Sequence, residues 1–380
     1  MAISTTTPES PWPRSEPSAM TPGDEQAGLR DAVRGTLDKH STIEKIRAVS
    51  STEAGYSPEL WRRLVEDMSV TTIAAPADRG GLGYGMVEMG IILEECGRSL
   101  TPEPVYQSAI LGVQALMHST TDDSLPLLDS VLGGDSIAAV SDLSADSDHL
   151  QAGRIDSDWV VDGQALHVVG GSGADVVVIS AQHDGQTALF AVPKSDAVSS
   201  IDRSVLDPTR RQADLTFTRA PATILASGAE ASDVVSRLRD IATLAIASEN
   251  TGIADALLQM TLDYVKTRHQ FGRPIGSFQA VKHRLADMLI ELERARSAAR
   301  YAAAVYDENP DDARVAIAVA GAVCSDAAVH AAHEAVQLHG GVGFTWEHPA
   351  HSYFRRAMGN AALQGDSRSH RRRIADLIGV

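Results

Sequence analysis

The chain has 380 residues, of which 43% are apolar and 22% charged, and its 33 basic and 50 acidic side chains give a formal net charge of −17. Such a surface repels nucleic acid and anionic membranes, which excludes a general binder of polyanions. Cys96 and Cys324 lie far apart, so they predict neither a disulfide framework nor a cysteine-based metal site. We therefore expect no metal and a cytoplasmic location, with no apolar run long enough to span a bilayer and no apolar signal core at the N-terminus.

The composition and hydrophobic pattern of the sequence change three times along the chain, which predicts an α+β protein. Residues 1–25 are rich in Ser, Thr, Pro and Glu and predict a disordered tail. Residues 26–130 are helical in pattern, with Ser57 as a helix N-cap and a later helix ending near Gly97. Residues 131–225 contain short β-branched segments separated by Asp-Gly and Gly-Gly turns, which predict a small β-barrel or sandwich. Residues 229–380 are helical again and predict a bundle.

Two junctions in the last segment carry unusual residues. "KTRHQFGRPIGSFQ" holds Arg268, Phe271 and Phe278 in a Gly/Pro frame, where a plain hinge with two aromatic core residues is one interpretation. "QLHGGVGF" places Gly340 and Gly341 after a helix, where they either end that helix or let a phosphate or a second backbone approach closely.

Taken together and in this order, the two stretches resemble the acyl-CoA dehydrogenase family. The family pattern R-x-x-F-G-x-x-I-x-x-F-Q is complete from Arg268 to Gln279, and Q-x-x-G-G-x-G matches Gln337 to Gly343. The resemblance implies an N-terminal helical domain, a middle β-domain and a C-terminal four-helix bundle, usually in a tetramer. It also implies FAD as the cofactor, with Arg268 at the pyrophosphate because a guanidinium offers a fork of donors to phosphate oxygens. The other cofactor-binding residues that it implies, several of them reaching FAD across a subunit interface, are Phe271, Phe278, Gln279, Gln337, Gly340 and Gly341.

The β-domain departs from the family pattern near the flavin. Ser141 stands where the family has a Thr that precedes a Gly-rich loop, but "AAVSDLSADSD" lacks the glycines. His167 and Val169 replace an aromatic residue and a Thr. The hydroxyl of Ser141 is expected either to bind the flavin or to cap a strand.

The catalytic base of the family is also replaced. Gln364 stands where the resemblance expects a Glu, and an amide cannot accept a proton at neutral pH. A second family position for the base falls on Ala242, which is also vacant. Glu249 shares that helix face about 10 Å further along the axis, and burial would raise its pKa toward that of a base, or it is a structural carboxylate bound to an arginine or amide. Asp366 is either a base or a helix N-cap.

The resemblance implies α,β-dehydrogenation of an acyl-CoA thioester to a 2-enoyl-CoA in fatty-acid or sterol side-chain β-oxidation. A base removes the α-proton and the β-hydrogen leaves to the flavin as hydride. The vacant base positions are similar to those of subunits of actinobacterial heterotetrameric acyl-CoA dehydrogenases, which act on bulky sterol side-chain esters.

Three interpretations remain open: a dehydrogenase that uses Glu249, a non-catalytic FAD-binding partner subunit, and a flavin monooxygenase with the same fold. The expected partners are an acyl-CoA, a homo- or hetero-oligomer with a second such subunit, and an electron-transfer acceptor, but not nucleic acid or membrane. The basic run "HRRRIAD" is either a solvated helix end or a contact to the phosphates of CoA.

Overall fold

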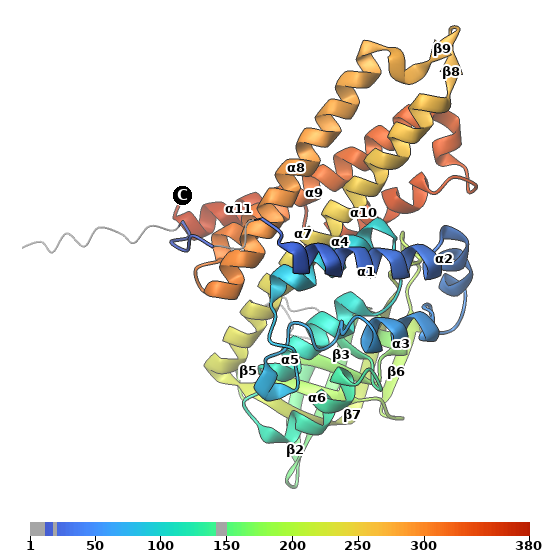
Figure 1. Cartoon of the computed structure of the whole chain (residues 1–380). Helices are drawn as coiled ribbons and strands as arrows, with labels where there is room; N and C mark the ends of the chain where they lie inside the picture. The colour runs from blue at the N-terminus through green and yellow to red at the C-terminus, as the bar shows by residue number, and fades with distance from the viewer. Residues whose placement is uncertain (1–11, 18–20, 142–149) are drawn as a thin grey trace, which may run out of the picture.

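The computed structural model describes residues 12–17, 21–141 and 150–380. Helices form the first part of the chain, strands the middle and helices the last part, which confirms the predicted α+β architecture (Figure 1). Most of the predicted tail and the segment after Ser141 lie outside the described residues. Within the tail, the backbone N–H groups of Arg14 and Ser15 donate to Asp312 at 2.7 and 3.1 Å, so residues 12–17 lie against the bundle.

The N-terminal helices begin and end largely where the sequence predicts. Ser57 caps one of them by accepting a hydrogen bond from the N–H of Leu60 at 3.2 Å, and another ends at Arg98, beside the expected Gly97. The first helix begins at Asp24, two residues before the expected domain boundary. The elements are α1 (Asp24–His40), α2 (Ile43–Ser50), α3 (Pro58–Glu66), η2 (Ala77–Arg79), α4 (Met86–Arg98), the π-helix η3 (Val105–Gly112), α5 (Val113–Met117), η4 (Asp122–Ser124) and α6 (Leu125–Leu132).

The middle domain is a closed β-barrel, which decides between the two predicted architectures. Its strands are β1 (Ala138–Val140), β2 (Leu150–Ile155), β3 (Asp158–Val169), β4 (Val176–His183), β5 (Gln186–Pro193), β6 (Val198–Asp202) and β7 (Gln212–Ser227). The ring runs β4–β5–β7–β3–β2 and closes where Gln151 of β2 pairs with Gln182 of β4. Strand β1 pairs in parallel with β4, and β6 pairs in antiparallel with β7. The inward-facing side chains, among them Val161, Ile179, Phe190, Leu215 and Phe217, form a core of their own.

The C-terminal helices pack into a bundle. Its elements are α7 (Gly228–Thr267), the hairpin strands β8 (His269–Gln270) and β9 (Arg273–Pro274), η6 (Ile275–Ser277), α8 (Gln279–Glu308), α9 (Arg314–His339), η7 (Gly340–Phe344), α10 (Ala350–Gln364) and α11 (Ser367–Ile378). Helix α7 is buried on several sides in its centre, as its nearly continuous apolar sequence predicts. It runs from beside the barrel to the hairpin at the far end of the bundle (Figure 1).

One expectation about apolar length is wrong. Residues Arg314–Phe344, which include α9, are long and apolar enough to cross a membrane by length and composition. The structure explains the composition differently, because 72% of the most apolar window is buried inside the protein. Helix α9 packs against α7, α8, α10 and α11, so its apolar surface is the centre of the bundle.

Helices α4 and α7 cross with their backbones in direct contact. A Cβ built on Gly97 of α4 would lie 2.1 Å from the carbonyl oxygen of Glu249. A Cβ on Gly252 of α7 would lie 1.8 Å from the carbonyl oxygen of Glu94. No side chain fits at either position, so both glycines are needed for this close approach.

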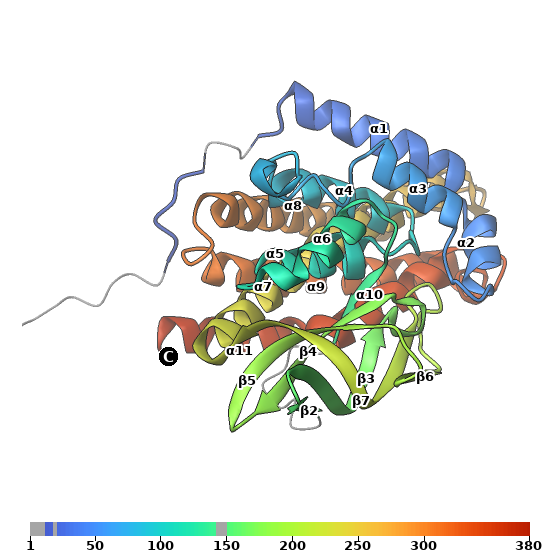
Figure 2. The same ribbon diagram turned by 90° about the horizontal axis from the view of Figure 1, so that it is seen from below.

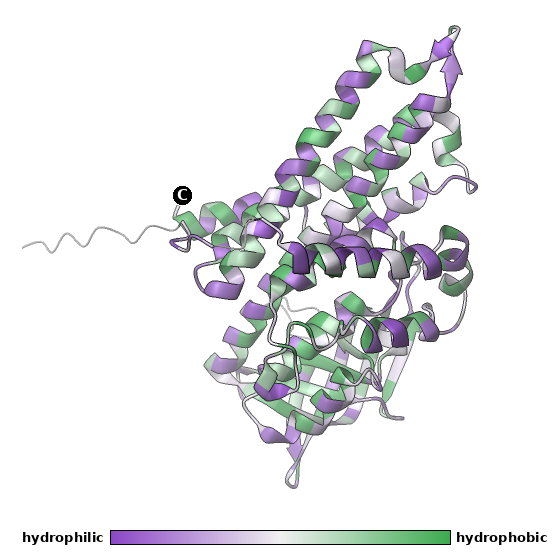
Figure 3. Ribbon diagram, viewed as in Figure 1, coloured by the Kyte–Doolittle hydropathy of each residue, from purple (hydrophilic) through white to green (hydrophobic). Residues whose placement is uncertain are grey.

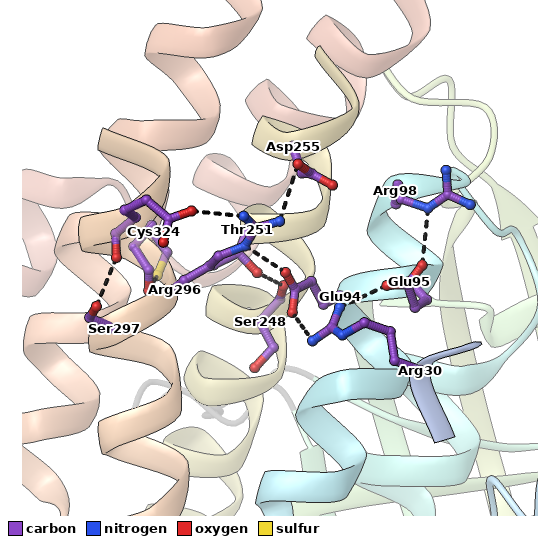
Figure 4. A network of polar contacts seen from close by, with 12 residues as sticks. Arg30, Glu94, Glu95, Arg98, Ser248, Thr251, Asp255, Arg296, Ser297 and Cys324 are labelled. Carbon is purple, nitrogen blue, oxygen red and sulfur yellow. Dashed lines mark hydrogen bonds and ion pairs between the residues drawn. The ribbon is translucent and has the colours of Figure 1, made fainter. Parts of the chain in front are cut away.

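A network of charged side chains surrounds this crossing and ties two more helices to it (Figure 4). Glu94 of α4 accepts from Arg30 of α1 at 2.6 Å and from Arg296 of α8 at 3.0 Å. Arg296 also contacts Asp255 of α7 at 3.1 Å, and Arg30 contacts Glu95 at 2.7 Å. The N-terminal helices are thus bound to the bundle, and the barrel lies to one side of both (Figure 2).

Candidate active site

A cleft of about 1020 Å³ lies where the N-terminal helices, the barrel and the bundle meet. Its volume is at the upper end of the range for small-molecule sites. Tyr106 and Gln107 of η3 form one wall, strands β1 and β3 another, and α7, α10 and α11 much of the rest. No Asp or Glu lies among the cleft-lining side chains of the described residues.

Gln364 faces this cleft from the C-terminal end of α10. The helix stops there because Gly365 takes a backbone conformation with φ of +93°, which other residues rarely adopt. The amide nitrogen of Gln364 donates to the hydroxyl of Tyr106 at 2.8 Å. The guanidinium of Arg210 lies 5.0 Å from the centre of the Tyr106 ring. The position that the resemblance gives to the base is therefore occupied by a hydrogen-bonded amide.

Glu249 lies in a different environment from the one expected. Only 2% of it is exposed, and its carboxylate accepts from Arg210 at 2.6 Å and from Arg356. Burial alone would raise its pKa, but the charges and hydrogen bonds of the two arginines outweigh burial and lower it. The expectation of a raised pKa is wrong, and Glu249 is not among the cleft-lining residues. The structure argues against Glu249 as the base and supports the structural alternative.

Arg356 is the centre of this buried ion network. It is 1% exposed and donates to Asp207 and to Thr209 as well as to Glu249. Burial would raise the pKa of Asp207, but the charge of Arg356 and hydrogen bonds outweigh it and lower that pKa. The network joins the long connection before β7 to α7 and α10. This network could not be predicted from the sequence, because Asp207, Glu249 and Arg356 come from distant segments of the chain.

Asp366 is a helix N-cap, which is one of the two interpretations that the sequence allowed. Its carboxylate accepts from the backbone N–H of Ser369 at 2.9 Å and from the hydroxyl of Ser369 at 2.8 Å. These hydrogen bonds, the backbone one first, lower the pKa of Asp366. The basic run that follows forms α11, where Arg371 pairs with Asp326 at 2.5 Å and Arg373 pairs with Asp240. Arg373 also lines the cleft.

Ser141 lines the cleft at the end of β1. Its backbone N–H donates to the carbonyl of Val178 at 2.8 Å, which extends the β1–β4 pairing. Its hydroxyl is buried and has no hydrogen-bond partner within the described part of the chain. His167 and Val169 of β3 line the same cleft. A buried hydroxyl with a spare hydrogen bond fits a ligand with polar ring atoms in this cleft.

The motif that the family resemblance assigns to FAD lies at the other end of the molecule. Arg268 ends α7 and is exposed, and its guanidinium forms no hydrogen bond or ion pair within the described residues. Phe271 lies in the turn of the β8–β9 hairpin, with φ of +53° and 90% exposure, and its ring packs edge-to-face on Phe278 at 6.2 Å. The hairpin strands are otherwise hydrophilic (Figure 3). Figure 1 shows this hairpin at the end of the bundle away from the barrel, so within one chain Arg268 does not reach the cleft.

The second half of the motif lies at the C-terminal end of α9. Gln337 and Gln279 lie near the surface, and a Cβ built on Gly340 or Gly341 would meet no atom within 4 Å. Gly340 has φ of +61°, a conformation that glycine adopts without strain. The exposed guanidinium of Arg268 and the open space at Gly340 and Gly341 let an anion approach closely, and so fit the pyrophosphate of FAD.

Large apolar side chains are exposed beside this motif. Phe344 is 77% and Trp346 68% exposed, in and just after η7. We give the name aromatic tip to the apolar residues of the two motif stretches, of which all but the half-buried Phe278 are exposed: Phe271, Phe278, Val342, Phe344 and Trp346. Large exposed apolar groups are typical of an interface.

Comparison with known proteins identifies the family. Two family models match, "Acyl-CoA dehydrogenase, N-terminal domain" over residues 23–124 and "Acyl-CoA dehydrogenase, C-terminal domain" over residues 234–379. The acyl-CoA dehydrogenase IpdE2 of Mycobacterium tuberculosis is 33% identical over 355 residues, covering 93% of this chain and 98% of the relative. FadE27 of the same organism is 31% identical over 91% of this chain and 94% of its own length.

Comparison with solved structures identifies the same family. The ChsE4–ChsE5 complex from Mycobacterium tuberculosis contains a chain that is 29% identical, with a TM-score of 0.86 over 95% of this chain and 98% of that one. A steroid acyl-CoA dehydrogenase variant named Tcur3481-Tcur3483 is 28% identical, with a TM-score of 0.84 over 94% of this chain and 98% of that one. The predicted fold is confirmed, and so is the predicted reaction class, dehydrogenation of an acyl-CoA thioester. This chain belongs to the acyl-CoA dehydrogenase family.

Proposed function

We propose that this chain is one subunit of a heteromeric, FAD-dependent acyl-CoA dehydrogenase that acts on bulky, steroid-type thioesters. The observation that carries the proposal is the cleft itself, in which Gln364 replaces the base and no described lining residue is an Asp or Glu. The FAD motif is complete in the same chain. An intact cofactor motif, together with no carboxylate among the described residues that line the cleft, supports dependence on a second chain for proton abstraction.

The relatives support a heteromeric assembly. IpdE2 is an acyl-CoA dehydrogenase, and one of the similar structures is a complex of two proteins, ChsE4 and ChsE5. A second similar structure is that of a steroid acyl-CoA dehydrogenase. We propose the same substrate class for this chain. We also propose a cytoplasmic location, because both cysteines are buried and free.

The placement of the cofactor residues favours a shared flavin site. Bound FAD would supply the acceptor for the hydride that leaves the β-carbon. Arg268, Gly340 and Gly341 would hold its pyrophosphate, and Ser141 would donate or accept a hydrogen bond at the cleft. Because these two groups lie at opposite ends of one chain, one FAD can contact both only where the tip of one subunit meets the cleft of another.

One end of the cleft is suited to the phosphates of CoA. Arg239 of α7, Arg314 of α9 and Arg373 of α11 line it together. Asp240 accepts from Arg373 and lies 4.0 Å from Arg314, so a single carboxylate is shared between two of these cations. Three arginines among the described residues therefore lie at this end of the cleft, although the whole chain carries a net charge of −17. Their guanidinium groups would offer hydrogen-bond donors to a polyphosphate there.

A gain-of-function variant tests the proposal. The assembly is prepared by co-expression with a candidate partner, a second acyl-CoA dehydrogenase-like chain, and reduction of its flavin is followed with a panel of acyl-CoA thioesters. Gln364→Glu restores a carboxylate at the family position and should add flavin reduction at this cleft to that at the partner's site, because a general base usually speeds this step by about 10²-fold or more. Gln164→Glu, which places a carboxylate elsewhere in the same cleft, is the control and should leave the rate unchanged.

The outcomes separate the alternatives. If the Gln364→Glu and Gln164→Glu assemblies behave alike, this cleft is not the site of α-proton removal and the chain contributes flavin contacts only. If the chain alone is a stable, flavin-loaded and fully active homo-oligomer, the need for a second gene product is contradicted. If the purified assembly oxygenates a substrate and leaves every acyl-CoA unchanged, the monooxygenase alternative replaces the dehydrogenase.

A further inference from the structure

A second, smaller cavity of about 50 Å³ lies directly beside the cleft. Gln107 and Val169 line both spaces, so these two side chains form the shared wall. The far side of the small cavity is formed by the N-terminal helical domain, including Tyr56 and Glu103. Its volume admits one hydroxyl-bearing carbon or a water molecule but no ring.

Glu103 is the unusual member of this cavity. It is only 5% exposed, and one carboxylate oxygen, Oε1, accepts from the backbone N–H of Ser57 at 3.2 Å. The other oxygen, Oε2, is buried and has no hydrogen-bond partner among the residues that the structure describes. Buried carboxylate oxygens in native proteins are normally satisfied, so an open one indicates a place for a donor.

The cations near Glu103 are engaged elsewhere. Arg210 lines the small cavity but binds Glu249 at 2.6 Å and Asn360 at 2.9 Å. Arg211 also lines it and donates to backbone carbonyls of the α2–α3 connection, including that of Glu53 at 2.9 Å. Burial raises the pKa of Glu103 to about 7 and outweighs the backbone N–H groups of Glu103 and Ser57 and the charge of Arg356, which all lower it. No described cation therefore forms an ion pair with the carboxyl group of Glu103.

The local backbone links this carboxyl group to the cleft. Glu103 stands two residues before the π-helix η3, whose Tyr106 contacts Gln364 and whose Gln107 forms part of the shared wall. π-Helical turns are rare and occur frequently at functional sites. One short segment thus contacts the reacting end of the cleft through Tyr106 and the small cavity through Glu103.

We infer that the small cavity is a distal acyl subsite, in which Glu103 selects CoA thioesters whose acyl group carries a hydroxyl at the end remote from the thioester. The inference rests on the proposed function, because it requires a thioester in the cleft. A remote hydroxyl that passes Gln107 donates to Oε2 and satisfies it. A plain alkyl end displaces water from the same place and leaves Oε2 unpaired, which is penalised. A remote carboxylate meets the partly ionised Glu103 and is repelled.

Pairs of thioesters that differ by one hydroxyl test the subsite. The probes are the CoA esters of hexanoic, octanoic and decanoic acid and their ω-hydroxy counterparts, titrated calorimetrically into the flavin-loaded assembly. At one chain length the wild-type assembly should bind the hydroxylated ester about 10- to 100-fold more tightly than the plain one. The ratio of the two dissociation constants is taken within one preparation, so a general loss of folded protein cancels.

Two substitutions of Glu103 give the contrast. Glu103→Leu removes both oxygens and should bring the ratio of dissociation constants to within about threefold of unity. Glu103→Gln keeps one acceptor oxygen and should retain part of the preference. Glu53→Gln is the matched control, because the exposed Glu53 lines the same cavity, and it should leave the ratio unchanged.

The results distinguish failure of the subsite from failure of the proposed function. If the wild-type assembly binds plain and hydroxylated esters equally at every length, or if Glu103→Leu keeps the wild-type ratio, the subsite is overturned while the proposed function stands. If the flavin-loaded assembly binds neither these esters nor a steroid-type CoA thioester, the proposed function is contradicted and the subsite with it. A hydroxyl preference that disappears in Glu103→Leu and persists in Glu53→Gln supports the assignment.

Discussion

Arg356 donates to Glu249 across 107 residues of sequence, and both side chains are almost completely buried. Arg210 binds the second oxygen of the same carboxylate at 2.6 Å. Two guanidinium groups therefore share this carboxylate in the interior, and Arg356 also pairs with the buried Asp207. Breaking such a pair from one side is expensive, because the remaining charge stays buried without a partner.

The first prediction is that Glu249→Gln destabilises the protein by on the order of 3–5 kcal/mol, the usual loss when one member of a buried ion pair is removed. Chemical denaturation of the flavin-loaded assembly measures it. The matched control is Glu59→Gln, which breaks an exposed pair with Arg63 on α3 and should have no measurable effect. A Glu249→Gln variant of wild-type stability that binds substrate but does not turn it over would restore Glu249 as the base.

The second prediction concerns pH. Burial raises the pKa of Glu103 to about 7 from its ordinary value of 4.5, so the folded state holds a proton that the unfolded state releases. This contribution to stability is fully present below about pH 4.5 and is lost as the pH rises through about 7. From about pH 4.5 to pH 8, wild type should lose up to about 3 kcal/mol relative to Glu103→Gln.

Urea unfolding of both proteins across this pH range measures the difference. Asp307, whose pKa burial raises to about 6, changes stability in the same direction in both proteins and cancels in the comparison. Asp207 and Glu249 have lowered pKa values, so their contributions are lost only as the pH falls, on the acid side of this window. The prediction would be contradicted if the free energy of unfolding changed with pH in the same way in wild type and in Glu103→Gln. The folded and unfolded states would then bind the same number of protons at Glu103.

The third prediction is that Arg268→Ala weakens FAD binding about 10- to 100-fold, the loss expected for charge-assisted hydrogen bonds to a pyrophosphate. Titration of the flavin-free assembly with FAD gives the dissociation constant. Lys266→Ala removes another exposed cation two residues earlier on α7 and is the control. Equal loss in both variants would mean that general charge, rather than the motif, retains the cofactor.

The fourth prediction concerns the aromatic tip. Phe344→Asp should dissociate the oligomer and release flavin, because it places a charge on the surface that we expect to meet a neighbouring subunit. Size-exclusion chromatography with light scattering measures the mass of the assembly. Ile201→Asp changes a similarly exposed apolar side chain on β6 of the barrel and should leave the mass unchanged. If the Phe344→Asp variant keeps its oligomeric mass, the aromatic tip is not the subunit interface.

Features that depend on neighbouring residues could be predicted from the sequence. The cap at Ser57, the helix end near Gly97 and the N-cap at Asp366 follow from local hydrogen bonding, and the structure confirms them. Barrel closure could not be predicted, because alternating side chains look the same in a barrel and a sandwich and the closing pair joins Gln151 to Gln182.

The pairing of the buried charged side chains could not be predicted from the sequence either. Helix geometry places Glu249 on the face of Ala242, but its partners Arg210 and Arg356 come from distant segments. Without them, burial alone predicts a raised pKa, and the sign of the shift is reversed when two cations are added. The same limit hides the contact between Tyr106 and Gln364, which are 258 residues apart.

The crossing at Gly97 and Gly252 has a mechanical consequence. The two helices are closely interlocked here, since even one methyl group at either glycine would overlap a carbonyl oxygen. This contact and the ion pairs around it hold the N-terminal helices against the bundle. Discrimination among ligands then falls to the side chains that line the cleft. New specificities arise when individual lining side chains are exchanged, while the frame that holds them stays the same.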